Sequence, residues 1–168
     1  MVGHWSVPDF ESKICPPEAL SERLARLPRP LVFTNGCFDI LHRGHVTYLA
    51  QARSKGEALV LALNTDASVR RLGKGGDRPI NSLENRAAVA AALESVDLVT
   101  WFDEDTPAVL IEAVRPEVLV KGGDWAVDKI VGSAETLARG GKVFSIPFLH
   151  QTSTTGTLEK IRASEGWK

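Results

Sequence analysis

The chain has 168 residues, of which 43% are hydrophobic and 24% charged, and its formal net charge is −1. This length suffices for one domain with a full hydrophobic core, and the composition is that of a soluble globular protein. So small a net charge excludes a field that attracts nucleic acid, and no apolar run approaches the ~20 residues of a membrane span. The N-terminus, MVGHWSVPDF, lacks the plan of a signal peptide, so we expect a cytoplasmic protein.

Hydrophobic periodicity alternates between strands and helices along the chain. Residues 1–15 carry little pattern and predict a loosely held arm, followed by a short helix at 16–28. Strands are predicted at 30–36, 57–66, 97–102, 117–125 and 142–148. Helices are predicted at 45–56, 66–73, 81–96, 105–116, 133–141 and 153–166, with Asn81 and Ser153 as N-terminal caps. Cys15 and Cys37 fit no CxxC pattern, so we expect both thiols to be free.

This alternation predicts an α/β fold, a Rossmann-like doubly wound sheet of five parallel strands with helices on both faces. No repeat or linker interrupts it, so we expect one domain over 1–168, with an N-terminal arm and short helix at 1–29 and a core at 30–163. Ligands of such sheets bind at the carboxyl ends of the strands. Those ends are the loops after Phe33, Leu63, Val120 and Phe148.

The first of these loops leads into a helix through FTNGCFDILHRGHVTYL, residues 33–49, with His42 and His45 on either side of Gly44. Residues three apart at a helix start share a face, so both imidazoles can point at one spot. Free N–H groups and the positive end of the helix dipole meet there, and Gly44 leaves room for a phosphate. The arrangement suits a triphosphate. Structural hydrogen bonding and a partial metal site are the alternatives, but no third ligand is evident, so we predict no metal site.

Other loops at the same edge carry further candidates. Ser153, Thr154 and Thr155 open the last predicted helix and predict a second phosphate site, whereas an ordinary serine cap explains only Ser153. Lys121 ends a buried strand, where a charge is costly unless it meets a ligand or partner, and we expect it to bind phosphate. Gly122, which follows it, and the neighbouring Gly123 allow a ligand to approach closely.

The glycine-rich segment GKGGDRP, residues 73–79, contains Lys74 and Arg78. It does not fit the phosphate loop GxxxxGK[ST]. We predict a mobile cationic lid over the substrates, with a merely solvated loop as the alternative. Arg86, in the next predicted helix, then faces that lid or solvent.

The stretch TNGCFDILHRGHVTYL resembles the HxGH signature of the nucleotidyltransferase superfamily. The resemblance covers roughly residues 30–163. In LNTDASVRRLGKGGDRPINSLENR, ALESVD, KGGDW and STTGTLEKI it is greatest to the heptose 1-phosphate adenylyltransferases, which form ADP-heptose for the lipopolysaccharide core. Many bacteria fuse such a domain behind a sugar kinase, but no kinase sequence precedes it here, so we expect a stand-alone domain.

The resemblance implies attack of a sugar-phosphate oxygen on the α-phosphate of ATP, with loss of pyrophosphate. Such chemistry needs positioning and positive charge rather than covalent help. The residues expected to act in catalysis are His42, His45 and Lys121. Those expected to bind the nucleotide are Asn35, Gly36, Phe38, Gly44, Asp124, Ser153, Thr154 and Thr155. Those expected to bind the acceptor or form the lid are Asp39, Lys74, Arg78 and Arg86.

Two of these assignments keep alternatives. Asp39 shapes the turn or meets the sugar phosphate, or else caps the helix that follows. Asp124 contacts the sugar or base of the nucleotide, or only fixes its own loop. Mg²⁺ is expected as the partner of ATP, held largely by phosphates and water. The resemblance also implies a homo-oligomer.

One departure affects the choice of reaction. Several relatives end in an ISSTxxR pattern whose arginine meets the phosphates, but Leu158 stands there in this chain and Lys160 is the nearest cation. A cytidylyltransferase acting on glycerol 3-phosphate or a similar small phosphate ester is the alternative enzyme. A non-catalytic nucleotide-binding module is the alternative outside catalysis. The paired histidines and Lys121 argue against it, because binding alone does not require so many charge-stabilising groups.

Overall fold

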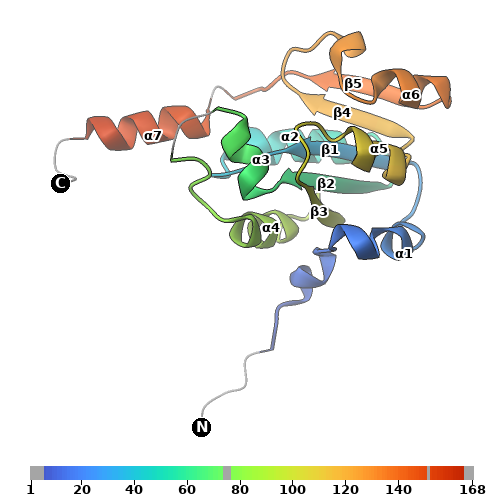
Figure 1. Cartoon of the computed structure of the whole chain (residues 1–168), viewed down its shortest axis with the longest axis horizontal. Helices are drawn as coiled ribbons and strands as arrows, with labels where there is room; N and C mark the ends of the chain where they lie inside the picture. Colours follow the sequence, from blue (N-terminus) through green and yellow to red (C-terminus); the bar gives the residue numbers. More distant parts are fainter. Residues whose placement is uncertain (1–5, 74–76, 151, 165–168) are drawn as a thin grey trace.

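The computed structural model describes residues 6–73, 77–150 and 152–164. Its sheet consists of parallel strands in the order β3-β2-β1-β4-β5 (Figure 1). The strands are β1 (Leu31–Gly36), β2 (Ala58–Asn64), β3 (Leu98–Phe102), β4 (Val118–Gly122) and β5 (Lys142–Ile146). The α-helices of the described part are α1 (Leu20–Leu24), α2 (Arg43–Arg53), α3 (Asp66–Arg71), α4 (Leu83–Ala91), α5 (Ala108–Val114), α6 (Ser133–Ala138) and α7 (Thr154–Ala163). Short 3₁₀ turns are η1 (Asp9–Lys13), η2 (Pro17–Ala19) and η3 (Val127–Lys129).

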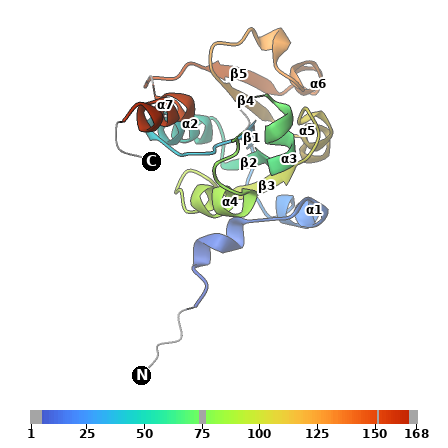
Figure 2. The same cartoon turned by 60° about the vertical axis from the view of Figure 1, so that its left-hand side comes forward.

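Each face of the sheet has its own hydrophobic core. In β2 the residues Ala58, Val60 and Ala62 pack on the face covered by α1 and α5, and the alternate leucines, 59, 61 and 63, pack on the face covered by α2 and α4. Figure 2 shows α2 and α5 on opposite sides of the sheet. A strand buried on both faces reads as an unbroken apolar run, as β2 does. The predicted α/β fold with a five-stranded parallel sheet is confirmed.

The strand order reverses beside β1. From β1 the chain adds β2 and then β3 on one side, and afterwards places β4 and β5 on the other side. The loops after β1 and β4 therefore diverge at the carboxyl edge, which is where open α/β sheets bind ligands.

The N-terminal segment packs more closely than its sequence predicts. The turn η1 lies against α4, Ile14 forms a parallel bridge with Val99, and the Cys15 N–H donates to the Val99 carbonyl over 2.8 Å. The prediction of a loosely held arm is therefore wrong for residues 9–15. The physical reason is that β3 is an edge strand, whose unpaired backbone groups accept a partner. Cys15 and Cys37 form no disulfide, as predicted, and both side chains are buried.

Two further observations complete the fold. The predicted cap Asn81 is wrong, because the hydroxyl of Ser82 accepts from the Asn85 N–H and caps α4 instead. Within the described residues, no helix is both long and apolar enough to cross a membrane.

Candidate active site

The two histidines of the first loop stack on each other. His42 is the N-cap of α2, and its Nδ1 accepts the His45 N–H over 3.4 Å. The ring centroids lie 3.8 Å apart with planes inclined by 20°. The structure thus brings both imidazoles to the N-terminus of α2, as the helical spacing predicts.

The environment of His42 favours its neutral form. Burial lowers the pKa of His42 below its ordinary value of 6.5, which favours the neutral ring at pH 7. Because Nδ1 accepts the His45 N–H, the neutral ring carries its proton on Nε2. His42 therefore offers one N–H donor at the helix terminus.

A second helix begins beside the first. The Ser153 hydroxyl caps α7 by accepting the Gly156 N–H over 3.0 Å, which confirms the predicted cap. The buried Thr154 hydroxyl donates to the Ile40 carbonyl over 3.3 Å and so ties α7 to the loop after β1. Figure 1 shows α7 projecting away from the sheet beyond this point.

A cavity of about 510 Å³ lies between these elements, and we call it the histidine cavity. Most of the predicted site residues line it: Asn35, Gly36, Phe38, Asp39, His42, His45, Arg78, Lys121, Ser153, Thr154 and Thr155. Cys37, Tyr48, Gly122, Phe148 and Thr152 complete its lining. Two helix N-termini, two imidazoles and the Lys121 cation thus surround one space, which favours an anionic ligand.

Among the described residues, three of the predicted ones do not line this cavity: Gly44, Asp124 and Arg86. A Cβ on Gly44 would lie 3.1 Å from the His42 ring and 3.3 Å from the His150 carbonyl oxygen, so the missing side chain accommodates the protein's own groups. Asp124 is exposed outside the cavity. Arg86 is buried elsewhere, as described below. The predicted lid residue Lys74 lies outside the described residues.

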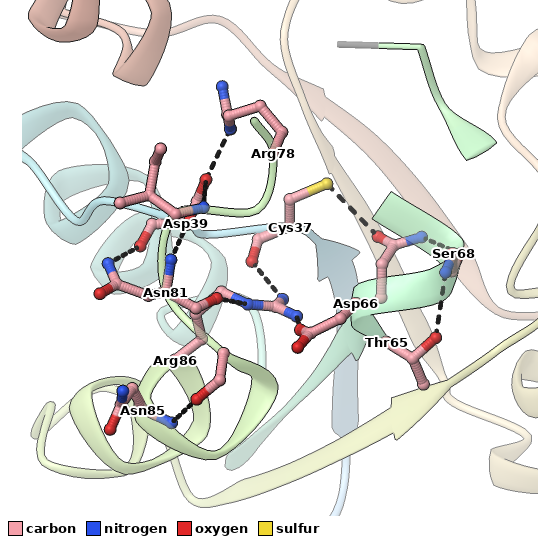
Figure 3. A network of polar contacts seen from close by, with 12 residues as sticks. Cys37, Asp39, Thr65, Asp66, Ser68, Arg78, Asn81, Asn85 and Arg86 are labelled. Atoms are coloured by element: carbon pink, nitrogen blue, oxygen red, sulfur yellow. Dashed lines mark hydrogen bonds and ion pairs between the residues drawn. The ribbon is translucent and has the colours of Figure 1, made fainter. Parts of the chain in front are cut away.

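The prediction that Arg78 belongs to a mobile or solvated loop is wrong. Its side chain is 5% exposed, and its Nε donates to the Asp39 carboxylate over 2.5 Å. Asp39 also accepts the N–H groups of Ile80 and Asn81. Figure 3 shows Asp39 beside Arg78 and Asn81. Burial raises the pKa of Asp39, but these two N–H groups and the Arg78 guanidinium outweigh it, and the pKa lies below its ordinary 3.8.

Asp39 therefore fixes the loop after β1 and does not cap α2, which His42 does. Its backbone carbonyl accepts the Asn81 side-chain amide over 2.7 Å, which is why Asn81 is not available as a helix cap. The ion pair of Asp39 and Arg78 lines the histidine cavity with its opposite charges already matched.

The prediction that Arg86 faces a lid or solvent is also wrong. Its guanidinium donates to the Asn81 carbonyl (3.0 Å), the Cys37 carbonyl (2.8 Å) and the Asp66 carboxylate (2.7 Å), and the side chain is fully buried (Figure 3). A planar guanidinium can satisfy three acceptors at once, which makes burial of its charge tolerable. Arg86 thus joins α4, α3 and the loop that carries Phe38.

Phe38 connects the loop that Arg86 holds to the histidine pair. Its backbone is left-handed, with φ +46°, and its ring packs beside the His45 ring at a centroid distance of 4.9 Å. The ring also occupies the space next to Gly36, where a Cβ would lie 2.7 Å from Phe38 Cε2.

The glycines of the KGGDW loop hold the protein's own aromatic rings. A Cβ on Gly122 would lie 2.8 Å from Phe148 Cζ, and one on Gly123 would lie 2.9 Å from Trp125 Nε1. The prediction that these glycines make room for a ligand is therefore wrong. Sequence reasoning assigned no role to either aromatic residue, although each is the last residue of a predicted strand, where functional residues gather.

A second cavity, of about 340 Å³, lies on the other side of Lys121, and we call it the tryptophan cavity. It shares Asn35, Gly36, Cys37 and Lys121 with the histidine cavity. Its remaining lining residues are Asn64, Leu72, Phe102, Asp105, Thr106, Pro107, Trp125, Lys129, Ile130 and Val131.

A larger cavity, of about 710 Å³, lies at the opposite edge of the sheet. The C-terminal ends of α1, α5 and α6 surround it, so its helix dipoles disfavour an anion. Three arginines also line this cavity, but each is paired with a carboxylate: Arg29 with Glu117, and Arg115 and Arg139 with Glu112. Across residues 6–73, 77–150 and 152–164, no three His, Cys, Asp or Glu side chains gather as metal ligands do.

A parallel sheet whose reversal point holds stacked histidines and two helix N-termini has the form of a nucleotidyltransferase. Residues 33–165 match the family described as cytidylyltransferase-like, and the chain belongs to that family. It is 57% identical over 155 residues to the D-beta-D-heptose 1-phosphate adenylyltransferase of Bordetella bronchiseptica, covering 91% of this chain and 96% of that one. It is 57% identical over 132 residues to the bifunctional protein HldE of Azotobacter vinelandii, covering 79% of this chain and 28% of that longer one.

Solved structures agree on the fold. The lipopolysaccharide core biosynthesis protein from Thermoplasma volcanium superimposes with a TM-score of 0.58 at 26% identity, over 73% of this chain and 98% of that one. Pantothenate synthetase from Thermus thermophilus superimposes with a TM-score of 0.59 over 83% of this chain and 63% of that one. Its identity of 18% supports the shared fold alone.

Proposed function

We propose that this chain transfers the adenylyl group of ATP to D-glycero-β-D-manno-heptose 1-phosphate, giving ADP-heptose and pyrophosphate, for the lipopolysaccharide core. One observation carries the proposal: 57% identity, over 91% of the chain, to a protein named as a heptose 1-phosphate adenylyltransferase. The histidine cavity supports it, because its donors suit the phosphates of a nucleotide.

In the proposed reaction a phosphate oxygen of the sugar attacks the α-phosphorus of ATP. The bond from that phosphorus to the oxygen bridging the α- and β-phosphates breaks, and pyrophosphate leaves with its electron pair. The N-termini of α2 and α7 would hold the phosphates. His42 would donate from Nε2 to the oxygens on which charge develops. His45, stacked on His42, would lie beside the same oxygens.

Lys121 would act between the two substrates. It is the cation shared by the histidine and tryptophan cavities, and a charge there can meet the α-phosphate and the acceptor phosphate together. Asn35, Gly36 and Phe38 would line the nucleotide site. Asp39 and Arg78 would serve indirectly, by fixing the loop that leads to the histidines.

Magnesium would enter as the complex with ATP. The carboxylate that lines the histidine cavity, Asp39, is occupied by Arg78 and two N–H groups, so the residues present fit a Mg²⁺ held by phosphates and water. Bound there, the ion would neutralise charge on the leaving pyrophosphate. We also propose that the enzyme is cytoplasmic and homo-oligomeric. Analytical sedimentation of the purified protein can test the oligomeric state.

The experiment is a pyrophosphate-release assay with ATP or CTP against heptose 1-phosphate and glycerol 3-phosphate, with the product identified by mass. We expect ADP-heptose from ATP and heptose 1-phosphate. Faster turnover of CTP with every acceptor would overturn the proposal in favour of the cytidylyltransferase alternative. Tight ATP binding without turnover of any acceptor would instead favour a binding module.

A further inference from the structure

The segments after β4 and β5 each present one aromatic ring, and the two rings line different cavities. Phe148 lies over Gly122 and lines the histidine cavity, whereas Trp125 lies over Gly123 and lines the tryptophan cavity. Lys121, directly before these glycines, lines both. Each cavity therefore has one aromatic ring, and the same lysine adjoins both.

Both rings are held in place, yet each is about half exposed. The Trp125 indole N–H donates to the Gly122 carbonyl over 3.1 Å, and its backbone N–H donates to the Ser145 hydroxyl over 2.9 Å. The Phe148 ring meets the Tyr48 ring edge-on, with centroids 5.7 Å apart. Exposure of 49% for Trp125 and 48% for Phe148 leaves ring surface for a ligand. Fixed aromatic rings bind flat ligand groups at little cost in side-chain entropy.

The histidine pair and the N-termini of α2 and α7, rather than the formal charges, distinguish the two cavities. The histidine cavity has two helix N-termini and the histidine pair, which suit a polyphosphate. Each cavity is lined by two cations and one carboxylate: Lys121, Arg78 and Asp39 in the histidine cavity, and Lys121, Lys129 and Asp105 in the tryptophan cavity. The Asp105 carboxylate accepts the Arg71 Nε–H over 2.9 Å, and its remaining lone pairs can accept sugar hydroxyls. Its volume of about 340 Å³ is close to the ~300 Å³ lower end for small-molecule pockets.

From this we infer that the tryptophan cavity is the acceptor site, in which the sugar ring packs on Trp125 and its hydroxyls meet Asp105 and Thr106. Phe148 then packs against the base of the nucleotide in the histidine cavity. The acceptor phosphate lies at Lys121, where the two cavities meet. This inference rests on the proposed function and assigns its two substrates to separate aromatic residues.

The test is a pair of matched variants, Trp125→Ala and Phe148→Ala, with Trp125→Phe as the conservative control. We expect Trp125→Ala to raise KM for heptose 1-phosphate about tenfold or more, with KM for ATP changed less than about twofold. Phe148→Ala should do the reverse, since stacking of a base on an aromatic ring is worth about tenfold or more. Trp125→Phe should recover most of the loss.

Calorimetric titration of MgATP, and separately of heptose 1-phosphate, gives a readout that does not depend on turnover. Unchanged MgATP affinity in Trp125→Ala, with weakened sugar-phosphate affinity, supports the inference and shows that the variant is folded. If wild type makes ADP-heptose but Trp125→Ala leaves the sugar-phosphate KM and affinity within twofold, the acceptor site is wrong and the function stands. If wild type makes no ADP-heptose, the proposed function fails and the acceptor site falls with it.

Discussion

The imidazole of His42 lies stacked on that of His45, with ring centroids 3.8 Å apart, while its Nδ1 accepts the His45 N–H. One ring thus orients the backbone from which the other projects. The two side chains therefore form a unit rather than two independent donors, and substitutions should reveal this.

We predict that His45→Ala lowers the single-turnover rate at saturating ATP by about 100- to 1,000-fold, the scale of losing one oriented oxyanion donor. ATP affinity should fall much less, because both helix N-termini remain and the developing charge is present only in the transition state. His42→Ala should act similarly, and the double variant should lose less than the sum of the two. Equal losses in rate and in ATP affinity would mean that the pair merely holds the nucleotide.

The ion pair of Asp39 with Arg78 predicts a pH-dependent stability. Asp39→Asn should destabilise the protein at pH 7 by about 3–5 kcal/mol, the usual cost of removing one partner of a buried pair. Because the folded pKa of Asp39 is below its ordinary 3.8, the stability it contributes is full above that pH and is lost as pH falls through the folded pKa. Urea unfolding at several pH values should show the two proteins converging in acid.

The matched control is Asp128→Asn, which removes an exposed carboxylate paired with Lys129. Little change is expected, because solvent screens such a pair. A difference between wild type and Asp39→Asn that stayed constant down to pH 3 would show that the lost stability does not come from the ionised carboxylate.

Lys121→Ala should damage turnover far more than folding. We expect turnover to fall by about 100-fold, since the side chain borders both cavities. The melting temperature should change by no more than about 2 °C. Lys142→Ala, an exposed lysine at the opposite end of the neighbouring strand β5, should leave both quantities unchanged. A large drop in melting temperature with near-normal turnover of the folded fraction would make Lys121 structural.

Sequence could predict those parts of the fold that depend on local pattern. The apolar run of β2 indicated a strand covered on both faces, and the spacing of His42 and His45 placed both at one helix terminus. Both features follow from periodicity within a few residues, so no distant partner had to be known.

The burial and the ion pairs of Arg78 and Arg86 could not be predicted from such local patterns. Arg78 pairs with Asp39, 39 residues away, and Arg86 with the Cys37 carbonyl, 49 residues away. A charged residue is normally exposed, and only its partners across the fold make burial tolerable. The prediction for the glycines of the KGGDW loop was wrong for the same reason. Sequence indicates that some group approaches the backbone closely there, but it does not show that this group is Phe148 or Trp125.

Gly122→Ala directly tests the packing of the Phe148 ring against Gly122. The new Cβ would lie 2.8 Å from Phe148 Cζ and 3.2 Å from Tyr48 Cε2, so the Phe148 ring must move. We expect a loss of about 1–3 kcal/mol in unfolding free energy, typical of overpacking, together with a raised KM for ATP. Steady-state kinetics and urea unfolding on the same preparation measure both effects.

The double variant Gly122→Ala/Phe148→Ala shows whether the effects of Gly122→Ala arise from its collision with the Phe148 ring. With the ring removed, most of the collision is gone, so Gly122→Ala should cost clearly less stability than it does in wild type and should raise KM for ATP no further. The smaller remaining cost reflects the contact with Tyr48. If Gly122→Ala raised KM for ATP equally in both backgrounds, the glycine would act on the nucleotide directly, and Phe148 would have no part in holding the base.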